Sequence, residues 1–94
     1  MAFVLECLDK PGALDIRLAN RPAHLAYLEA RLDTLIVAGP LLADDGKTPV
    51  GSLLILDLET RAEAEAFAAA DPYAQAGLFE RVSIRAYRKV FPQA

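Results

Sequence analysis

One side chain in this sequence is suited to proton transfer at neutral pH. His24 is the only histidine in the chain, and imidazole is the side chain whose unperturbed pKa lies nearest neutrality. A carboxylate that hydrogen-bonds one ring nitrogen fixes the tautomer and leaves the other nitrogen free as acid or base. Asp71 is the candidate for that carboxylate, although it is far from His24 in the sequence.

Both residues also have a purely structural interpretation. His24 lies four residues before Leu28, at the flank of an apolar helical stripe, where an edge-of-core histidine fits equally well. Asp71 precedes Pro72, and an Asp-Pro pair is a good N-cap and first residue for a short helical turn. A capping carboxylate can still orient an imidazole, so the residues alone leave both roles open.

Two arginines and a serine are candidates for ligand binding. Arg17 and Arg21 are four residues apart, so a helix through both presents them on one face. Two guanidinium groups beside a histidine suit a carboxylate or another anionic ligand. The alternative is a solvated face on which the arginines pair with Asp9, Asp15 or Glu29. Ser52 follows Gly51 at the start of a strand, where it either donates to a ligand or is an ordinary edge residue.

Composition argues against several other kinds of site. The single cysteine, Cys7, cannot form an internal disulfide, and no Cys/His cluster has zinc-ligand spacing, so we expect no metal and no cofactor. Cys7 lies in an apolar strand, where a buried thiol is inert. Lys47 follows Asp-Gly, but the sequence lacks the first glycine of a phosphate-binding loop, which stands several residues earlier, and the helix that follows such a loop. We therefore assign Lys47 no role.

Length and charge bound the class of protein. The 94 residues suit one domain, 1–94, and 54% are hydrophobic, above the ~45–50% typical of soluble domains. A net charge of −3 disfavours binding to nucleic acid. No apolar run approaches the ~20 residues of a membrane span, and the N-terminus lacks a signal-peptide pattern. We expect a cytoplasmic protein that binds neither membranes nor nucleic acid.

Apolar spacing in the first half of the chain predicts strand, helix and strand. Residues 3–8 form an apolar strand that ends in a turn at 9–12. A helix follows, broken near Asn20–Pro22 and then continuing to about Asp33. A second strand spans 35–42, at a sheet edge because Pro40 cannot donate to a strand ladder. The leucines expected on the buried helical face are Leu18, Leu25, Leu28, Leu32 and Leu35.

The second half is also predicted to form a strand, a helix and a strand. Residues 51–58 form a third strand, and Thr60 with Glu63 forms a capping box that starts a helix over 63–70. Residues 81–90 alternate as a fourth strand. The order βαββαβ predicts a ferredoxin-like α+β fold, an antiparallel sheet with two helices on one face.

The strands carry apolar residues on both faces, whereas two helices cover only one. Monomers rarely expose a large apolar face, so we expect a second copy of the chain to cover it and form a homodimer; a monomer is the alternative. In the first strand, one face carries Phe3, Leu5 and Cys7 and the other carries Val4 and Leu8. In the third strand, one face carries Leu54, Leu56 and Leu58 and the other carries Leu53 and Ile55.

Several segments resemble the YciI-like (YCII-domain) family. RLANRPAHLAYL at 17–28 resembles the helix signature of that family, and DPYAQAGLF at 71–79 is similar to its Asp-Pro-Tyr/Phe block. AGP at 38–40, GS at 51–52 and RKVF at 88–91 also match, so the resemblance covers nearly the whole chain. It implies a dimeric α+β barrel whose active site is His24 and Asp71, with Arg17, Arg21 and Ser52 lining the pocket.

The resemblance also implies kinship with dehydrochlorinase-type lyases of hydroxylated aromatics, and more distantly with muconolactone isomerase and monooxygenases. We therefore expect a cofactor-free lyase or isomerase, in which His24, oriented by Asp71, shuttles a proton on an anionic or phenolic small molecule. Two alternatives remain. One is a non-catalytic small-ligand-binding or accessory domain, since other reactive groups are scarce; the other is a dimer-forming scaffold in which Asp71 is only a cap.

Overall fold

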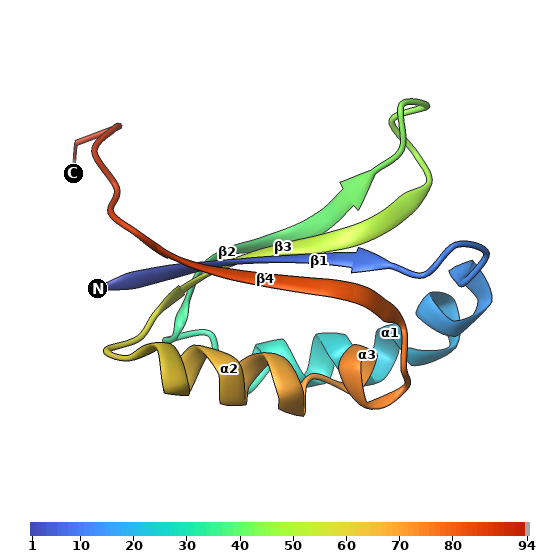
Figure 1. The fold of residues 1–94 in the computed structure, drawn as a ribbon, viewed down its shortest axis with the longest axis horizontal. Coiled ribbons are helices and arrows are strands. Elements are labelled where there is room, and N and C mark those ends of the chain that lie inside the picture. The colour runs from blue at the N-terminus through green and yellow to red at the C-terminus, as the bar shows by residue number, and fades with distance from the viewer. Residues whose placement is uncertain (94) are drawn as a thin grey trace.

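An antiparallel sheet forms one layer of the molecule, and the helices form a second layer on one of its faces (Figure 1). The computed structural model describes residues 1–93. The sheet order is β2-β3-β1-β4, and each neighbouring pair is antiparallel. This is the predicted ferredoxin-like α+β fold. Its elements are β1 (Ala2–Asp9), α1 (Leu14–Glu29), β2 (Leu35–Leu42), β3 (Pro49–Asp57), α2 (Arg61–Ala70), α3 (Pro72–Gln75) and β4 (Phe79–Tyr87).

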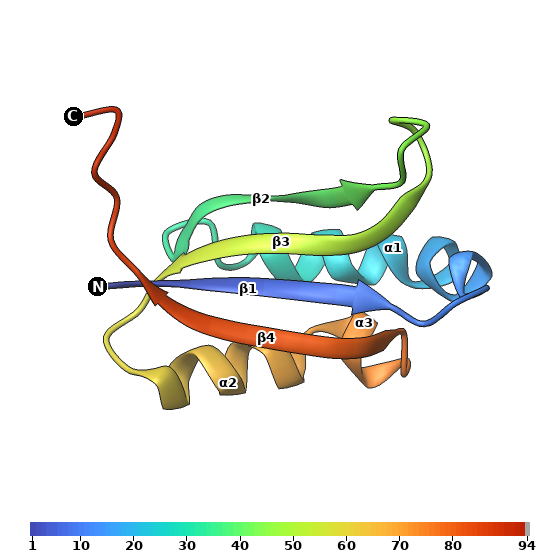
Figure 2. The ribbon, with the colours of Figure 1, turned by 45° about the horizontal axis from the view of Figure 1, so that its top comes forward.

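The apolar core lies between the central strands and the helices. Alternate residues of β1 and β3 point toward the helices, as the period of two in a strand requires. Figure 2 shows α1 under the β3 side of the sheet and α2 along β4. None of the described helices is long and apolar enough to cross a membrane. The buried members of the main core are Phe3, Leu5, Cys7, Leu28, Leu54, Leu56, Ala64 and Phe67.

The first helix differs from the prediction at Pro22. α1 runs without a break from Leu14 to Glu29 and ends earlier than expected. Pro22 cannot donate to the carbonyl of Leu18, but both residues are exposed, so that carbonyl remains open to water. The Asn20 side chain does not cap a new helix; its Nδ2 donates to the carbonyl of Ile16 at 2.9 Å. The predicted break was therefore wrong.

The buried face of α1 is also not the predicted leucine face. Arg17, His24 and Leu28 are the buried residues of this helix. The sheet packs against the face that carries the two polar side chains, because each of them finds a buried partner there, as shown below. Of the leucines expected inside, Leu28 alone is buried in α1, whereas Leu18, Leu25 and Leu32 are 55%, 39% and 65% exposed.

The second half follows the prediction closely. The Thr60–Glu63 capping box starts α2. In the first half, β2 lies at the sheet edge, as Pro40 predicted. Asp71 caps α3 by accepting a hydrogen bond from the backbone N–H of Tyr73. β4 is shifted relative to the predicted strand, since it begins at Phe79 and ends at Tyr87. Residues 88–90, which continue the alternation in sequence, lie beyond the ladder with β1.

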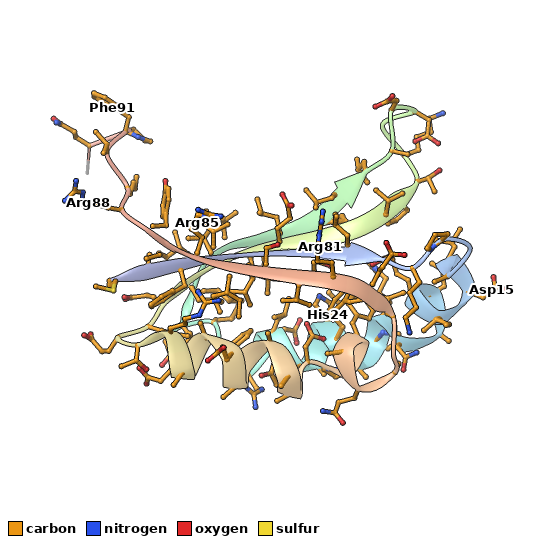
Figure 3. All side chains as sticks on the ribbon, viewed as in Figure 1. Asp15, His24, Arg81, Arg85, Arg88 and Phe91 are labelled. Carbon is orange, nitrogen blue, oxygen red and sulfur yellow. The ribbon has the colours of Figure 1, made fainter. Side chains whose placement is uncertain are left out.

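The sheet face opposite the helices carries both apolar and charged side chains. Cross-strand pairing puts Val4, Ile55 and Val37 on this face, and Val37 is half exposed. β4 adds Arg81 and Arg85 to the same face, where both point away from the helices (Figure 3). We propose that a second copy of the chain covers this surface, because exposed apolar faces favour association.

That proposal predicts a particle of twice the chain mass. Light scattering after gel filtration should give about twice 10.2 kDa for the wild type. An Ile55→Glu variant should shift the distribution toward the monomer, because a carboxylate buried between two sheets loses its hydration. A monomeric wild type at all concentrations would contradict the proposal.

Close packing of β1 against β3 makes a second prediction. A Cβ at Gly51 would overlap the carbonyl oxygen of Cys7. Gly51→Ala should therefore cost about 1–3 kcal/mol and lower Tm by at least about 4 °C. Gly39→Ala is the matched control, since nothing lies within 4 Å of the Cβ position there. Equal Tm values for the two variants in thermal denaturation would contradict the prediction that a Cβ at Gly51 overlaps the Cys7 carbonyl.

The buried thiol supplies a third prediction. Burial, with a smaller contribution from the charge of Asp71, raises the pKa of Cys7 to about 12. The thiolate fraction in the folded protein is therefore very small, and the thiol should resist Ellman's reagent near pH 8. Addition of urea should release one reactive thiol per chain. Rapid reaction of the folded protein would be inconsistent with this environment.

Candidate active site

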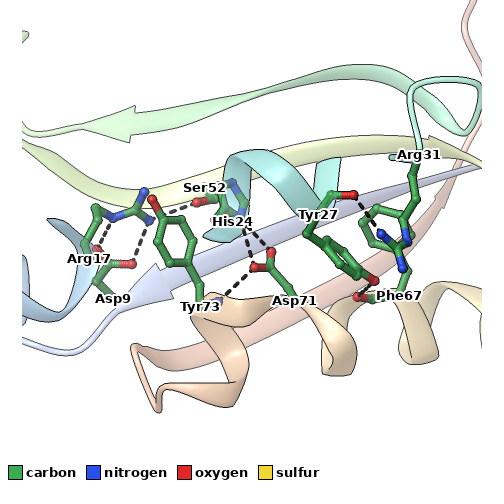
Figure 4. Close-up of polar contacts among 9 residues, drawn as sticks. All are labelled: Asp9, Arg17, His24, Tyr27, Arg31, Ser52, Phe67, Asp71 and Tyr73. Carbon is green, nitrogen blue, oxygen red and sulfur yellow. Dashed lines mark hydrogen bonds and ion pairs between the residues drawn. The ribbon is translucent and has the colours of Figure 1, made fainter. Parts of the chain in front are cut away.

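A histidine and a carboxylate meet between α1 and the start of α3 (Figure 4). Nδ1 of His24 lies 2.9 and 3.1 Å from the two carboxylate oxygens of Asp71. The residues are 7% and 3% exposed. Oδ1 of Asp71 also accepts from the backbone N–H of Tyr73 at 2.9 Å. One carboxylate thus caps α3 and holds the imidazole, so the two interpretations of Asp71 are compatible in the structure.

This pair determines which nitrogen of His24 is available. An ionised carboxylate can only accept hydrogen bonds, so Nδ1 carries the proton and Nε2 of the neutral ring keeps a lone pair. Nε2 has no hydrogen-bond partner among residues 1–93. Every fully buried polar side-chain atom of these residues has a partner, so Nε2 is not fully buried. Since His24 also lines a cavity, Nε2 is the atom accessible to a ligand.

The aromatic ring of Tyr73 holds two of the polar groups in place. It stacks on the imidazole of His24, with ring centroids 4.0 Å apart and planes 15° from parallel. Cζ of Arg17 lies 4.6 Å from the centroid of the same ring. Burial raises the pKa of the Tyr73 hydroxyl, although the charges of Arg17 and Arg21 act in the opposite direction. The phenol is therefore protonated at neutral pH.

Arg17 is buried rather than on a solvated face. Its Nε and Nη2 donate to the carboxylate of Asp9 at 2.7 and 3.0 Å, and Nη2 also donates to Oγ of Ser52 at 2.9 Å. Burial alone would lower the pKa of Arg17, but the hydrogen bond and charge of Asp9 outweigh it and raise that pKa. The guanidinium stays charged, and the Ser52 hydroxyl keeps its own hydrogen for another acceptor.

These groups border a cavity of about 320 Å³ beside α1 and the β2–β3 part of the sheet. His24, Tyr73, Arg17 and Ser52 form one connected polar cluster on its wall. Arg21 and Lys47 also line it; both are exposed, and neither forms an ion pair with a described residue. The cavity therefore favours anionic ligands. Its aliphatic lining includes Leu18, Leu25, Pro40 and Leu42.

Most of the residues at this site were predicted from the sequence, but some were not. The structure brings His24, Asp71, Arg17 and Ser52 together and places Arg21 at the cavity wall. Tyr73 was not selected, although its place two residues after Asp71 was a usable signal. Lys47 was set aside, and Asp9 was considered only as a solvated partner of arginine. No group of three or more metal-ligating side chains occurs within residues 1–93.

Comparison with known proteins places the chain in a family. The YCII-related domain model matches residues 1–88. Protein YciI of Escherichia coli O6:H1 and that of Shigella flexneri are each 42% identical over 98 residues, which cover 97% of this chain and all of theirs.

Two solved structures are informative. The 5-chloro-2-hydroxyhydroquinone dehydrochlorinase of Burkholderia phenoliruptrix AC1100, in complex with 2,5-dihydroxybenzoquinone, is 36% identical, with a TM-score of 0.86 over 94% of each chain. SnoaB, a cofactor-independent oxygenase of Streptomyces nogalater, has a TM-score of 0.57 at 16% identity, over 98% of this chain and 96% of its own. The second likeness concerns the fold alone. Domain match, relatives and fold agree, and the chain belongs to the YCII family.

Proposed function

We propose that this chain is a lyase or isomerase that moves a proton on a ring-hydroxylated, anionic or phenolic small molecule, with His24 as general base and then general acid. The observation that carries the proposal is the hydrogen bond from Nδ1 of His24 to Asp71, which leaves Nε2 at the cavity. The dehydrochlorinase relative supports the substrate class, because its substrate is a chlorinated hydroxyhydroquinone.

The first step is the same for either reaction type. Nε2 of His24 takes a proton from a ring hydroxyl, and the oxygen becomes negatively charged. The Arg17 guanidinium and the Ser52 hydroxyl stabilise that oxygen, since both groups are on the same cavity wall as His24. Asp71 stabilises the imidazolium that forms, as an orienting carboxylate does for a catalytic histidine.

The second step distinguishes an isomerase from a lyase. His24 returns the proton to a ring carbon, which completes an isomerisation. If that carbon carries a halide, His24 then removes a second hydroxyl proton; the electron pair moves through the ring, the halide leaves with its bonding electrons, and a quinone remains. Hydrogen halide is the only other product, so the sequence needs no oxidant.

Cavity size and lining suit a substrate of this kind. About 320 Å³ lies at the lower end of the range of about 300–1,000 Å³ for small-molecule sites, which suits a single ring. The aliphatic side chains of Leu18, Leu25 and Pro40 offer surfaces for the ring faces. The polar cluster then lies at one side of the bound ring.

Matched variants of His24 and Asp71 test the proposal. A panel of halogenated hydroquinones is assayed for halide release and for ring isomerisation. His24→Gln should lower kcat by about 10²–10⁴-fold, the usual contribution of a positioned base. Asp71→Asn keeps the cap of α3, because Asn caps as well as Asp, yet removes the charge beside Nδ1; its kcat should fall while its Tm changes little.

The outcomes separate the three interpretations. Unchanged turnover in His24→Gln would reject the proton-transfer role. A panel member that stabilises the wild type but is recovered unaltered would favour the ligand-binding domain. If no panel member raises Tm, and Asp71→Ala lowers Tm whereas Asp71→Asn does not, Asp71 is a cap only and the scaffold interpretation holds.

A further inference from the structure

We infer that Lys47 and Arg21 together bind an anionic substituent of the substrate, so that this protein prefers hydroxylated aromatic acids over the parent phenols. The inference rests on the proposed function, because it concerns the same cavity and assigns one end of the substrate to His24. It adds Lys47 to the residues predicted to bind the substrate, and it adds a carboxylate to the groups that the substrate carries.

Lys47 lies in a turn that is fixed by its own hydrogen bonds. The turn joins β2 to β3 and rises from the end of these strands (Figure 1). The Asp45 carboxylate accepts from the backbone N–H groups of Lys47 and Thr48, at 2.8 and 2.9 Å, and from Oγ1 of Thr48 at 2.6 Å. The hydrogen bonds from Thr48 and the Lys47 backbone lower the pKa of Asp45.

This arrangement leaves the Lys47 ammonium without a partner among residues 1–93. Asp45 is the acidic residue nearest to Lys47 in the sequence, yet its carboxylate is engaged by the turn. No ion pair to Lys47 is formed among the described residues. The backbone of Lys47 is held while its side chain lines the cavity. A fixed turn that presents an unpaired cation to a cavity is suited to binding an anion.

Arg21 presents a second such cation from α1. It lies one helical turn after Arg17, but the two arginines differ in their partners. Arg17 is buried and bonded to Asp9 and Ser52, whereas Arg21 is exposed and has no ion pair with a described residue. The paired guanidinium belongs to the polar cluster around His24, whereas the two unpaired cations line the same cavity and have no hydrogen bond or ion pair to that cluster.

The cavity also presents apolar side chains, which suit the ring of a ligand with two polar ends. Leu18, Leu25 and Leu42 line the same cavity, although they are 55%, 39% and 46% exposed. A hydroxylated ring covers such side chains, with its reacting hydroxyl at His24. A carboxylate on the same ring then meets the cations of Lys47 and Arg21.

The test uses matched pairs of compounds that differ by one carboxylate: phenol with para-hydroxybenzoate, catechol with protocatechuate, and hydroquinone with gentisate. Affinities are measured by calorimetry on the full chain. The wild type should bind at least one acid about tenfold more tightly than its parent. Lys47→Gln and Arg21→Gln should each weaken the acid by about three- to tenfold and leave the parent unchanged. Added salt should reduce the preference.

Lys89→Gln is the control, because it removes one exposed positive charge that does not line this cavity. It should bind acids and parents as the wild type does. Equal affinities within every pair, or equal losses for acid and parent in the two variants, would overturn the inference and leave the proposed function standing. Failure of all acids and parents to bind would overturn the inference and count against the proposed function as well.

Discussion

Arg17 carries its charge inside the protein, 4% exposed, and the groups that compensate this charge also build the site. Asp9 comes from the end of β1 and Ser52 from β3, and both bond to the guanidinium. Removing one partner of a buried pair typically costs about 3–5 kcal/mol, because the other charge stays unpaired. The requirement therefore fixes which face of α1 contacts the sheet, and His24, on that same face, is turned inward with it.

The same packing explains how His24 is oriented. Asp71 reaches the imidazole because the end of α2 brings it beside α1, and its cap of α3 fixes the direction of the carboxylate. Tyr73, on the first turn of α3, stacks against the ring and prevents it from tilting. Each contact has a structural function of its own, so the site is held in one geometry before any ligand binds, which is the arrangement that acid–base catalysis requires.

Local patterns in the sequence predict the elements and their order well. Alternation and the Thr60 capping box depend on neighbouring residues, so a single chain reveals them. The inward face of α1 was not predictable in this way, because leucine spacing favours Leu18 and Leu25, whereas burial of Arg17 depends on partners in distant strands. Lys47 was missed for a related reason: its side chain meets α1 only across the cavity.

Proton transfer by His24 requires that Nδ1 donates to Asp71 and that Nε2 is free to act as the base. Nitrogen NMR of protein labelled at histidine tests it directly, because the chain has one histidine and one pair of ring signals. For the neutral ring we expect a protonated Nδ1 and an unprotonated Nε2, with the Nδ1 signal altered in Asp71→Asn. A neutral ring protonated at Nε2, or spectra that do not change in Asp71→Asn, would contradict it.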